Sequence, residues 1–340
     1  MSIKQIGFSL IIFVSWFSQA QTLNGRVIDS NTKAPIETAT VYFDNTTIGV
    51  STNANGEFSI VYNDAIQSVL VVSFLGFEKQ VITDYRTLSY VTVELKEQID
   101  VLDEVFLTDN DGLTRIQKIK QFKKEFLGTS ANAKSCKILN EDDIILRYHK
   151  PSKTLTATSK NPVLVLNTNL QYEIAYDLID FEIKYKYVDE KQDIFNINSV
   201  IYTGTSFYKS IGKIDAEKLD KFRQKALNGS VQHFMRALYK EDLEAEGFQI
   251  FHKSFIVKPW DFFTVSTHEN PNLKQVSLKD KVVILYNKKA QSSLQVHSEF
   301  FVIDQYGNYA PINTVLFSGE MGSQRIGDSL PFDFEPLEVD

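Results

Sequence analysis

The segment Gly229–Arg236 places three side chains capable of chemistry close together. In a helix that begins after Ser230, His233 and Arg236 lie one turn apart on a shared face. Ser230 and His233 could act as nucleophile and general base, but no carboxylate that would orient the histidine is apparent. Ser230 is also a favourable N-cap, so we interpret it first as a helix cap. The second interpretation is an anion-binding site formed by Ser230, His233, Arg236 and the helix N-terminus. We rank catalysis third.

A second pair of polar residues raises the question of a metal site. His297 and Glu299 are two residues apart, which places them on one face of a strand. A third ligand would have to come from elsewhere, such as His252 or His268, and no spacing specifies it. We therefore interpret His297 and Glu299 as a polar pair in a sheet. We predict no metal and no cofactor.

The remaining reactive residue types stand alone in the sequence. The acidic run Glu141–Asp143 lacks the alternating ligand spacing and the turn glycine of a calcium loop, so it reads as a solvated turn. Trp260, beside Asp261, could stack on a sugar ring, although burial in a core is the more common outcome. Cys136 is the only cysteine, and we expect it to be an inert thiol.

The N-terminus reads as an export signal over residues 1–20. Lys4 precedes the apolar run Ile6–Phe17, and Ser18–Ala20 is an acceptable small-x-small cleavage site. The run is too short for a spanning helix, and an uncleaved anchor is the alternative. No cysteine follows it directly, so lipid anchoring is not expected. We predict a periplasmic or outer-membrane-associated protein that is not a lipoprotein.

Charge distribution narrows the possible partners. The net charge is -7, and both signs are scattered along the chain without a basic stripe. Nucleic acid is therefore a poor partner. No other apolar run is long enough to form a transmembrane helix.

The segment 21–97 has the pattern of a small β-sandwich. Short alternating strands are separated by turn residues at regular intervals, such as the cluster around Gly56. Ala39, Val41 and Phe43 fall on one strand face, whereas the strand around Val71 is apolar on both faces. The spacing of these elements predicts two packed sheets.

This segment resembles the carboxypeptidase regulatory-like domain, a transthyretin-like β-sandwich common in envelope proteins of Bacteroidetes. The resemblance implies a non-catalytic accessory fold. In zinc carboxypeptidases the module accompanies a separate metal-bearing domain, but no His-x-x-Glu pair occurs here. The matching residues are Gly25, Val27, Asp29, Pro35, Ala39, Val41, Gly49, Thr52, Gly56, Phe58, Ser73, Gly76 and Phe77.

Residues 98–130 read as a linker strand followed by a helix. The segment Leu102–Thr108 resembles the stretch that follows the same module in TonB-dependent receptors, which implies a partner contact through Leu102, Glu104 and Val105. An ordinary linker strand is the favoured interpretation. Helical spacing of apolar residues then predicts a helix over Gly112–Gly128, with a basic, solvated opposite face. The apolar residues are Leu113, Ile116, Ile119, Phe122 and Phe126.

Residues 131–340 read as one α+β domain of unknown function, built on a large antiparallel sheet. Strand alternation changes parity near Asp180, which predicts a bulge or bend inside one long strand. A helical block over Asp215–Glu246 separates two groups of strands. Motifs such as Leu227–Ser230 and Leu330–Pro331 resemble a Bacteroidetes envelope family that has this module in front. That resemblance implies localisation and architecture, not mechanism.

Together these features predict an all-β front joined to an α+β domain: a transthyretin-like sandwich followed by a larger antiparallel-sheet domain with helices. We expect a non-catalytic cell-envelope protein that binds a protein partner or a glycan. Two alternatives stay open: a hydrolase in the C-terminal domain, and an accessory of a TonB-dependent transport system. The sequence does not determine the ligand or the oligomeric state.

Overall fold

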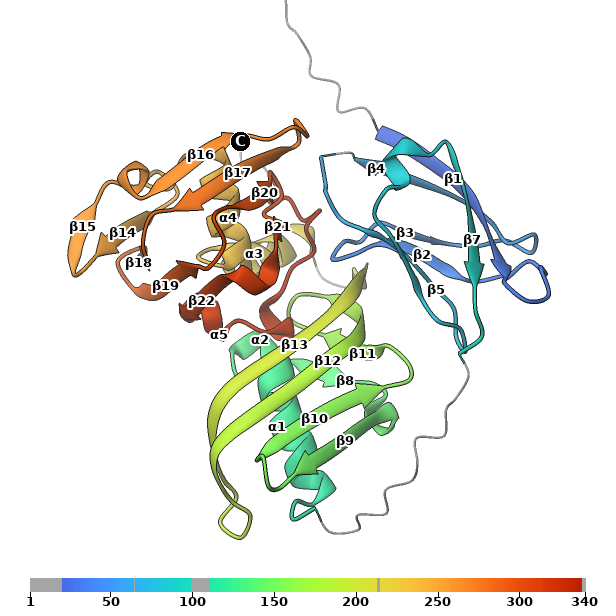
Figure 1. Cartoon of the computed structure of the whole chain (residues 1–340), viewed down its shortest axis with the longest axis horizontal. Helices are drawn as coiled ribbons and strands as arrows, with labels where there is room; N and C mark the ends of the chain where they lie inside the picture. Colours follow the sequence, from blue (N-terminus) through green and yellow to red (C-terminus); the bar gives the residue numbers. More distant parts are fainter. Residues whose placement is uncertain (1–19, 64, 99–110, 213–214, 338–340) are drawn as a thin grey trace, which may run out of the picture.

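The computed structural model describes residues 20–63, 65–98, 111–212 and 215–337. These residues form three units, each around its own hydrophobic core. In Figure 1 the sandwich (residues 20–98) is blue to cyan, the ribbon unit (residues 111–210) is green to yellow, and the two-sheet unit (residues 231–323) is orange to red. The protein is mostly β, with several antiparallel sheets and a few helices, as the sequence predicts. Among the described residues, no helix is both long and apolar enough to cross a bilayer.

The sandwich consists of a three-stranded sheet in the order β4-β1-β7 and a four-stranded sheet in the order β3-β2-β5-β6. Strand β1 pairs antiparallel with β4 and parallel with β7. Alternate residues of β4, including Phe58 and Ile60, point into the core between the sheets. The strands are β1 (Ala20–Asp29), β2 (Thr40–Phe43), β3 (Gly49–Ser51), β4 (Glu57–Asn63), β5 (Leu70–Ser73), β6 (Gln80–Ile82) and β7 (Tyr90–Leu95).

The ribbon unit is a six-stranded antiparallel sheet covered by helix α1. Its long ribbon pairs β12 (Tyr172–Asp189) with β13 (Ile194–Ser210) along nearly their whole length. The other edge of β12 is shared by β11 at one end and β10 at the other. The remaining elements are α1 (Arg115–Leu127), α2 (Ala131–Lys134), β8 (Cys136–Ile138), β9 (Ile144–His149), β10 (Thr154–Ser159) and β11 (Val163–Asn167).

Helix α1 belongs to the core of the ribbon unit. It begins at Thr114, which forms a capping box with Gln117, and it ends at Gly128 with a φ of 96°. Phe122 packs on Phe181 with ring centroids 4.7 Å apart, and Phe126 also lies in this core. The structure therefore places α1 inside a folded unit, not in the linker expected over residues 98–130.

The two-sheet unit contains a five-stranded sheet, β15-β14-β18-β19-β22, and a four-stranded sheet, β16-β17-β20-β21. Apolar residues of α4 (Val231–Lys240) share their core. Helix α3 (Ala216–Leu227) precedes this unit. The strands are β14 (Phe248–His252), β15 (Phe255–Val257), β16 (Phe263–Thr267), β17 (Leu273–Leu278), β18 (Val282–Tyr286), β19 (Ala290–Val296), β20 (Phe301–Asp304), β21 (Tyr309–Ala310) and β22 (Val315–Gly319), and α5 (Glu320–Ser323) follows.

The last described segment returns from the two-sheet unit to the ribbon unit. Ile326, Leu330 and Phe334 are buried in the core that contains α1. Residues 131–340 were expected to form one domain, but they contribute to two cores. The chain passes from the core of the ribbon unit to that of the two-sheet unit and then back. The C-terminal segment (residues 324–337) ties these two cores together.

The turn between β2 and β3 connects the sandwich to the ribbon unit. The Ser206 N–H donates to Asp44 Oδ1 at 2.7 Å, and the Asn45 N–H donates to the Ser206 carbonyl at 2.8 Å. Nearby, the Tyr42 hydroxyl donates to Asp177 Oδ2 at 3.1 Å. We call this set of contacts the joint.

The joint extends to the C-terminal segment and has a counterpart on the two-sheet unit. The Thr47 N–H donates to Asp333 Oδ1 at 2.8 Å. Away from this turn, the Gln67 N–H donates to Asp304 Oδ2 at 3.0 Å, and the Asn63 side-chain amide donates to the Tyr306 hydroxyl at 2.9 Å. The sandwich is therefore hydrogen-bonded to both other units.

Candidate functional site

Ser230 caps helix α4. Its Oγ accepts a hydrogen bond from the His233 N–H at 3.0 Å, which satisfies one of the free amide groups of the first turn. Phe234 and Leu238 on the same helix are fully buried. Capping, the first interpretation of this serine, is what the structure shows.

Both ring nitrogens of His233 are engaged in hydrogen bonds. Nδ1 accepts from the Gly229 N–H at 3.0 Å, so the proton of the neutral ring is on Nε2, which lies 3.0 Å from Glu246 Oε2. Burial lowers the pKa of His233, while the Glu246 carboxylate opposes that shift. Neither nitrogen is positioned to take a proton from the Ser230 hydroxyl. The arrangement fixes the start of α4.

Arg236 is a partly buried cation that binds backbone carbonyls. Its Nε donates to the Tyr306 carbonyl, and its Nη2 donates to the carbonyls of Phe332 and Phe334, each at 2.9 Å. Burial lowers the pKa of the guanidinium. Ser230 and His233 are thus in contact with each other, whereas Arg236 holds the C-terminal segment. The three side chains do not converge on one opening.

The histidines proposed as metal ligands lie apart. Strand β19 ends at Val296, so His297 and Glu299 are exposed residues after it and do not share a strand face as the sequence suggested. His252 Nε2 lies 2.9 Å from Asp280 Oδ2, and His268 Nδ1 accepts from a backbone N–H two residues on. Within the described ranges, no group of three His, Cys, Asp or Glu side chains could hold a metal ion.

The acidic run Glu141–Asp143 forms a single 3₁₀ turn. Asp143 accepts hydrogen bonds from the amides of Asn140 and Asn161, at 2.9 and 3.0 Å, and these bonds lower its pKa. Both amides donate to Oδ2, so this oxygen of Asp143 is already engaged by neighbouring side chains.

Cys136 is a partly buried thiol whose Sγ donates to the Asn132 carbonyl at 3.3 Å. Burial raises the pKa of Cys136 to about 12, so almost none of it is thiolate at neutral pH. Trp260, expected in a core, lies in the 3₁₀ turn Pro259–Asp261 and is exposed. The predicted partner contacts Leu102, Glu104 and Val105 lie outside the described residues.

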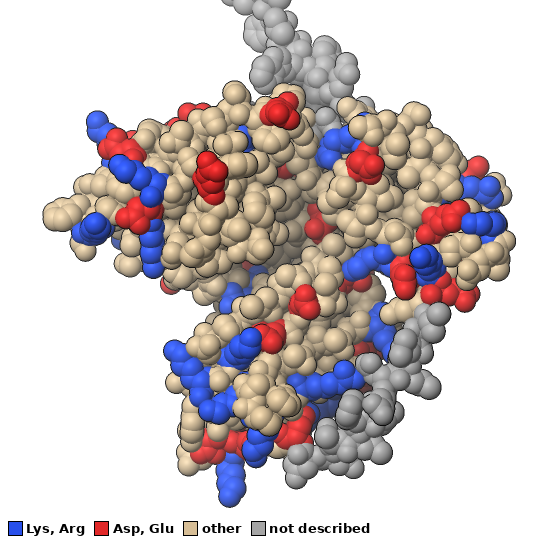
Figure 2. Space-filling model, viewed as in Figure 1, with Lys and Arg blue, Asp and Glu red and all other residues tan. Residues whose placement is uncertain are grey.

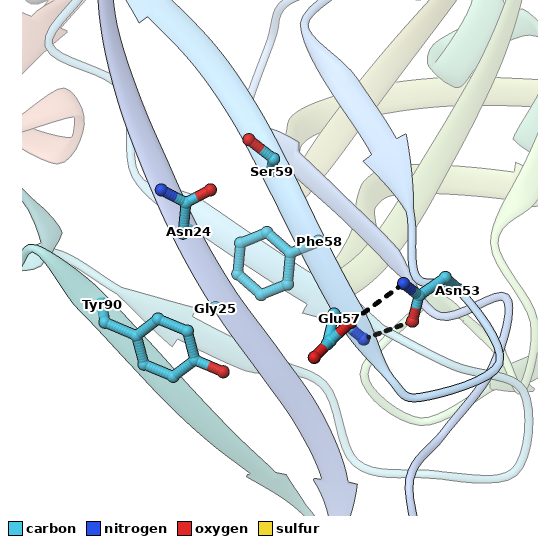
Figure 3. Close-up of a pocket in the computed structure, with 7 residues that line it drawn as sticks. All are labelled: Asn24, Gly25, Asn53, Glu57, Phe58, Ser59 and Tyr90. Atoms are coloured by element: carbon cyan, nitrogen blue, oxygen red, sulfur yellow. Dashed lines mark hydrogen bonds between the residues drawn. The ribbon is translucent and has the colours of Figure 1, made fainter.

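A depression of about 360 Å³ lies on the β4-β1-β7 sheet of the sandwich (Figure 3). The pairing register places Ser59 of β4, Asn24 of β1 and Tyr90 of β7 in one row across the three strands. All three residues are exposed, so the row presents a hydroxyl, an amide and an aromatic ring to solvent. We call Ser59, Asn24 and Tyr90 the outer row.

Gly25 and Phe58 form the floor of this depression. A Cβ at Gly25 would lie 2.4 Å from the Val91 carbonyl oxygen and 2.5 Å from the Phe58 ring, so only glycine allows this close approach. At the rim, Glu57 and Asn53 exchange two hydrogen bonds, drawn as dashed lines in Figure 3. The rim is held in place by the turn that precedes β4.

The outer row has the groups to bind a ligand, but the residues that line the depression do not include a set suited to acid–base or nucleophilic catalysis. Glu57 is the only titratable carboxylate in the lining, and its partner is the neutral amide of Asn53. Hydrogen-bond donors and acceptors beside an aromatic ring are typical of a binding surface. Reasoning from sequence missed the outer row, because it depends on the register of three strands.

Figure 2 shows Lys and Arg side chains interspersed with Asp and Glu over the visible face. Many of these charges are paired across elements, as Lys33 is with Glu94 at 2.9 Å. Over most of this face neither sign of charge forms a continuous patch.

Comparison with known proteins gives one family match. Residues 23–107 match the CarboxypepD_reg-like domain family. Curated proteins give no match to this sequence. The chain is 13% identical to the solved structure of a 9R-lipoxygenase from Cyanothece PCC8801, over 72% of this chain and 50% of that chain, with a TM-score of 0.19. It therefore spans half of the lipoxygenase.

A second similar structure is a protein of unknown function from Bacteroides fragilis NCTC 9343. The identity is 13%, the match covers 85% of this chain and 98% of that chain, and the TM-score is 0.19. At these TM-scores neither structure supports an inference about fold or function. The family match, by contrast, coincides with the sandwich and with the motif residues that fill its core and turns. The chain therefore carries a CarboxypepD_reg-like domain at residues 23–107.

Proposed function

We propose that this protein is a non-catalytic cell-envelope protein whose sandwich binds a glycan at the outer row. The observation that carries the proposal is Tyr90, which is 52% exposed on β7 beside Asn24 and Ser59. Export rests on the signal-like segment 1–20, of which residues 1–19 lie outside the described residues.

The chemistry of the outer row suits a sugar ring. A pyranose has apolar C–H faces and a rim of hydroxyl groups, so it is matched by an aromatic ring next to hydrogen-bonding side chains. Tyr90 supplies the ring, while the Asn24 amide both donates and accepts hydrogen bonds. The Ser59 hydroxyl adds a further donor and acceptor. The depression is open enough for an internal residue of a chain, because both ends of the row reach the sheet edge.

The test is a binding measurement against a panel of envelope-type glycans, with Tyr90→Ala and Asn24→Ala variants. We expect the wild-type chain to bind a glycan and each variant to lose about tenfold or more in affinity, because each removes a contact worth roughly 1–2 kcal/mol. Tyr187→Ala is the matched control, since Tyr187 is also a tyrosine with 52% exposure but lies on β12. It should bind as the wild type does.

Two results would contradict the glycan assignment. Equal losses in the Tyr90 and Tyr187 variants would indicate a nonspecific effect. Binding to no glycan on the panel, together with a Tyr90-dependent cross-link to a protein, would replace the glycan by a protein partner. Thermal unfolding of each variant would show that the substituted chain is folded.

A further inference from the structure

The outer edge of the two-sheet unit exposes large apolar side chains. Phe255 is 75% exposed, Ile256 is 62% exposed and Trp260 is 41% exposed. Phe255 and Ile256 belong to β15, the edge strand of the five-stranded sheet. In Figure 1 this strand lies at the far left, at the extremity opposite the sandwich. Within the described parts of the chain, no element covers these side chains.

These residues are connected by the β14–β15 hairpin. Phe255 pairs with His252 across the two strands, and the His252 ring contacts Phe262 with centroids 4.7 Å apart. Phe262 in turn follows Trp260 by two residues. His252 and Phe262 therefore connect Phe255 to the segment that carries Trp260, and we call Phe255, Ile256 and Trp260 the hairpin end.

Lysine residues surround the hairpin end. Lys253 and Ser254 form the two-residue turn, with φ of 48° and 71°, which is the geometry of a type I′ hairpin. Lys258 follows β15, Lys281 precedes β18, and the Lys279 ammonium lies 5.8 Å from the centroid of the Phe262 ring.

Few of these lysines are neutralised nearby. In the described part of the chain, Lys253, Lys258 and Lys281 have no ion-pair partner within 4.0 Å. The carboxylates in the region are Asp261 and Asp280. Asp280 Oδ2 lies 2.9 Å from His252 Nε2, and this hydrogen bond, together with the charge of Lys253, lowers the pKa of Asp280. Figure 2 shows this edge as a tan extremity with blue side chains on several sides and red ones between them.

We propose that the hairpin end contacts the surface of a membrane that contains anionic phospholipids. Phe255, Ile256 and Trp260 enter the boundary between headgroups and acyl chains, where aromatic side chains are favoured. The lysines keep their ammonium groups at the level of the lipid phosphates. A protruding edge with separate apolar side chains, ringed by unpaired cations, matches such a surface in charge. This inference does not depend on glycan binding by the sandwich.

The tryptophan content gives a direct test. The chain has two tryptophans, Trp16 and Trp260, so Trp16→Phe in the full chain leaves Trp260 as the sole tryptophan. The probe is phosphatidylcholine vesicles with or without phosphatidylglycerol, prepared with or without brominated acyl chains. We expect phosphatidylglycerol vesicles to shift the Trp260 emission to the blue and brominated chains to quench it. Because Trp260 is the reporter, binding through any other segment does not produce this signal.

Two variants in the Trp16→Phe background connect the signal to the hairpin end. Phe255→Ser combined with Ile256→Thr should weaken vesicle binding measured at Trp260 by about tenfold or more, because it removes two side chains from the apolar boundary. Lys253→Gln combined with Lys281→Gln should weaken binding to phosphatidylglycerol vesicles and flatten its dependence on salt. Leu75→Ser is the control, since Leu75 is a comparably exposed apolar residue on the sandwich.

The outcomes separate clearly. Trp260 emission that no vesicle changes, in a chain that circular dichroism shows to be folded, would overturn the proposal. So would quenching that is equal in the Trp16→Phe chain and in the Phe255/Ile256 variant of that chain. If vesicles leave the Trp260 emission unchanged and the hairpin end cross-links to a protein, the region is a protein-binding surface and the membrane proposal is wrong. Loss of the Trp260 signal with retained glycan binding would leave the function of the outer row intact.

Discussion

Gly25 and Arg236 show how single residues set the sandwich and the C-terminal segment. Gly25 allows β1 to approach the Phe58 ring and the Val91 carbonyl oxygen, and this contact forms the floor beneath the outer row. Arg236 binds three backbone carbonyls through a charged donor, and two of them belong to the C-terminal segment. Neither residue reacts with anything, yet each fixes the position of the residues around it.

Gly25→Ala should destabilise the sandwich by about 2 kcal/mol or more, because the new Cβ would overlap a backbone oxygen that cannot move aside. Urea unfolding followed by circular dichroism measures the change. The neighbouring variant Asn24→Ala, at an exposed position, should stay within about 0.5 kcal/mol of the wild type. Equal stabilities for Gly25→Ala and Asn24→Ala would show that the strands can separate to accept the methyl group.

Arg236→Met should lower the free energy of unfolding by about 2–4 kcal/mol, since it removes three hydrogen bonds from a charged donor while keeping the length of the side chain. Arg115→Met provides the comparison. Arg115 also donates to two backbone carbonyls, those of Ile144 and Glu141, but at a more exposed position. It should cost less than half as much, and thermal unfolding of the two variants side by side decides the point.

At the scale of elements, the sequence predicts where helix α1 begins and ends, but it predicts only part of the buried face. Thr114 and Gly128 begin and end the helix, within two residues of the predicted range. Ile116, expected on the buried face, is 78% exposed. Six residues separate Ile116 from Phe122, which rotates it by roughly 120° away from that phenylalanine around the helix. The buried stripe is set by Phe122 and Phe126.

Phe126→Ala should cost about 3–5 kcal/mol of stability, because its ring is fully buried against Tyr176 and Phe122. Ile116→Ala on the same helix should change stability by less than about 0.5 kcal/mol. Chemical unfolding of both variants measures this contrast. A small effect of Phe126→Ala would mean that α1 is a dispensable linker after all.

In the long ribbon, the alternation within one strand predicts some features, whereas others depend on the strand that pairs with it. The change of parity near Asp180 predicted a bulge, and the register shifts between Leu178 and Asp180 confirm it. Two further shifts, between Lys184 and Tyr187, were not predicted. They depend on which residues of β13 lie opposite, and a single strand pattern does not contain that information. The outer row escaped prediction for the same reason.

At the scale of the whole molecule, the joint could not be predicted, because its residues resemble ordinary turn residues. Asp44 and Asn45 are typical of tight turns, and their partner Ser206 lies more than 150 positions away. The raised pKa of Asp44, about 6, arises first from burial, against which the backbone N–H groups of Ser206 and Asn45 act. The joint thus holds a carboxylate that is costly to keep ionised at neutral pH.

Stability should therefore depend on pH through Asp44. Its pKa is raised from 3.8 to about 6 on folding, so the folded state binds the proton more tightly and its contribution to stability grows as the pH falls from about 7 towards 4. Asp44→Asn keeps the acceptor for the Ser206 N–H without the charge. We expect this variant to exceed the wild type by about 2–3 kcal/mol at pH 7, with the difference vanishing near pH 4.

Asp29→Asn is the control for this pH dependence, because the pKa of Asp29 is lowered on folding whereas that of Asp44 is raised. Backbone N–H groups of Thr32 and Asn31 lower the pKa of Asp29, so its carboxylate stabilises the fold at neutral pH and loses that effect on acidification. This variant should be less stable than the wild type at pH 7 and should approach it as the pH falls. A difference between Asp44→Asn and the wild type that is constant with pH would contradict the assignment to Asp44.

The polar character of the joint also determines how the sandwich stays attached as the temperature changes. Apart from the Phe207 ring packed on Tyr42, the contacts of Asn45, Thr47 and Gln67 are hydrogen bonds. Separating polar contacts of this kind contributes less to the heat capacity of unfolding than exposing an apolar core does. The three apolar cores weaken on cooling, because their stabilisation is largely hydrophobic. We therefore expect the attachment between the units to weaken less on cooling than the cores do.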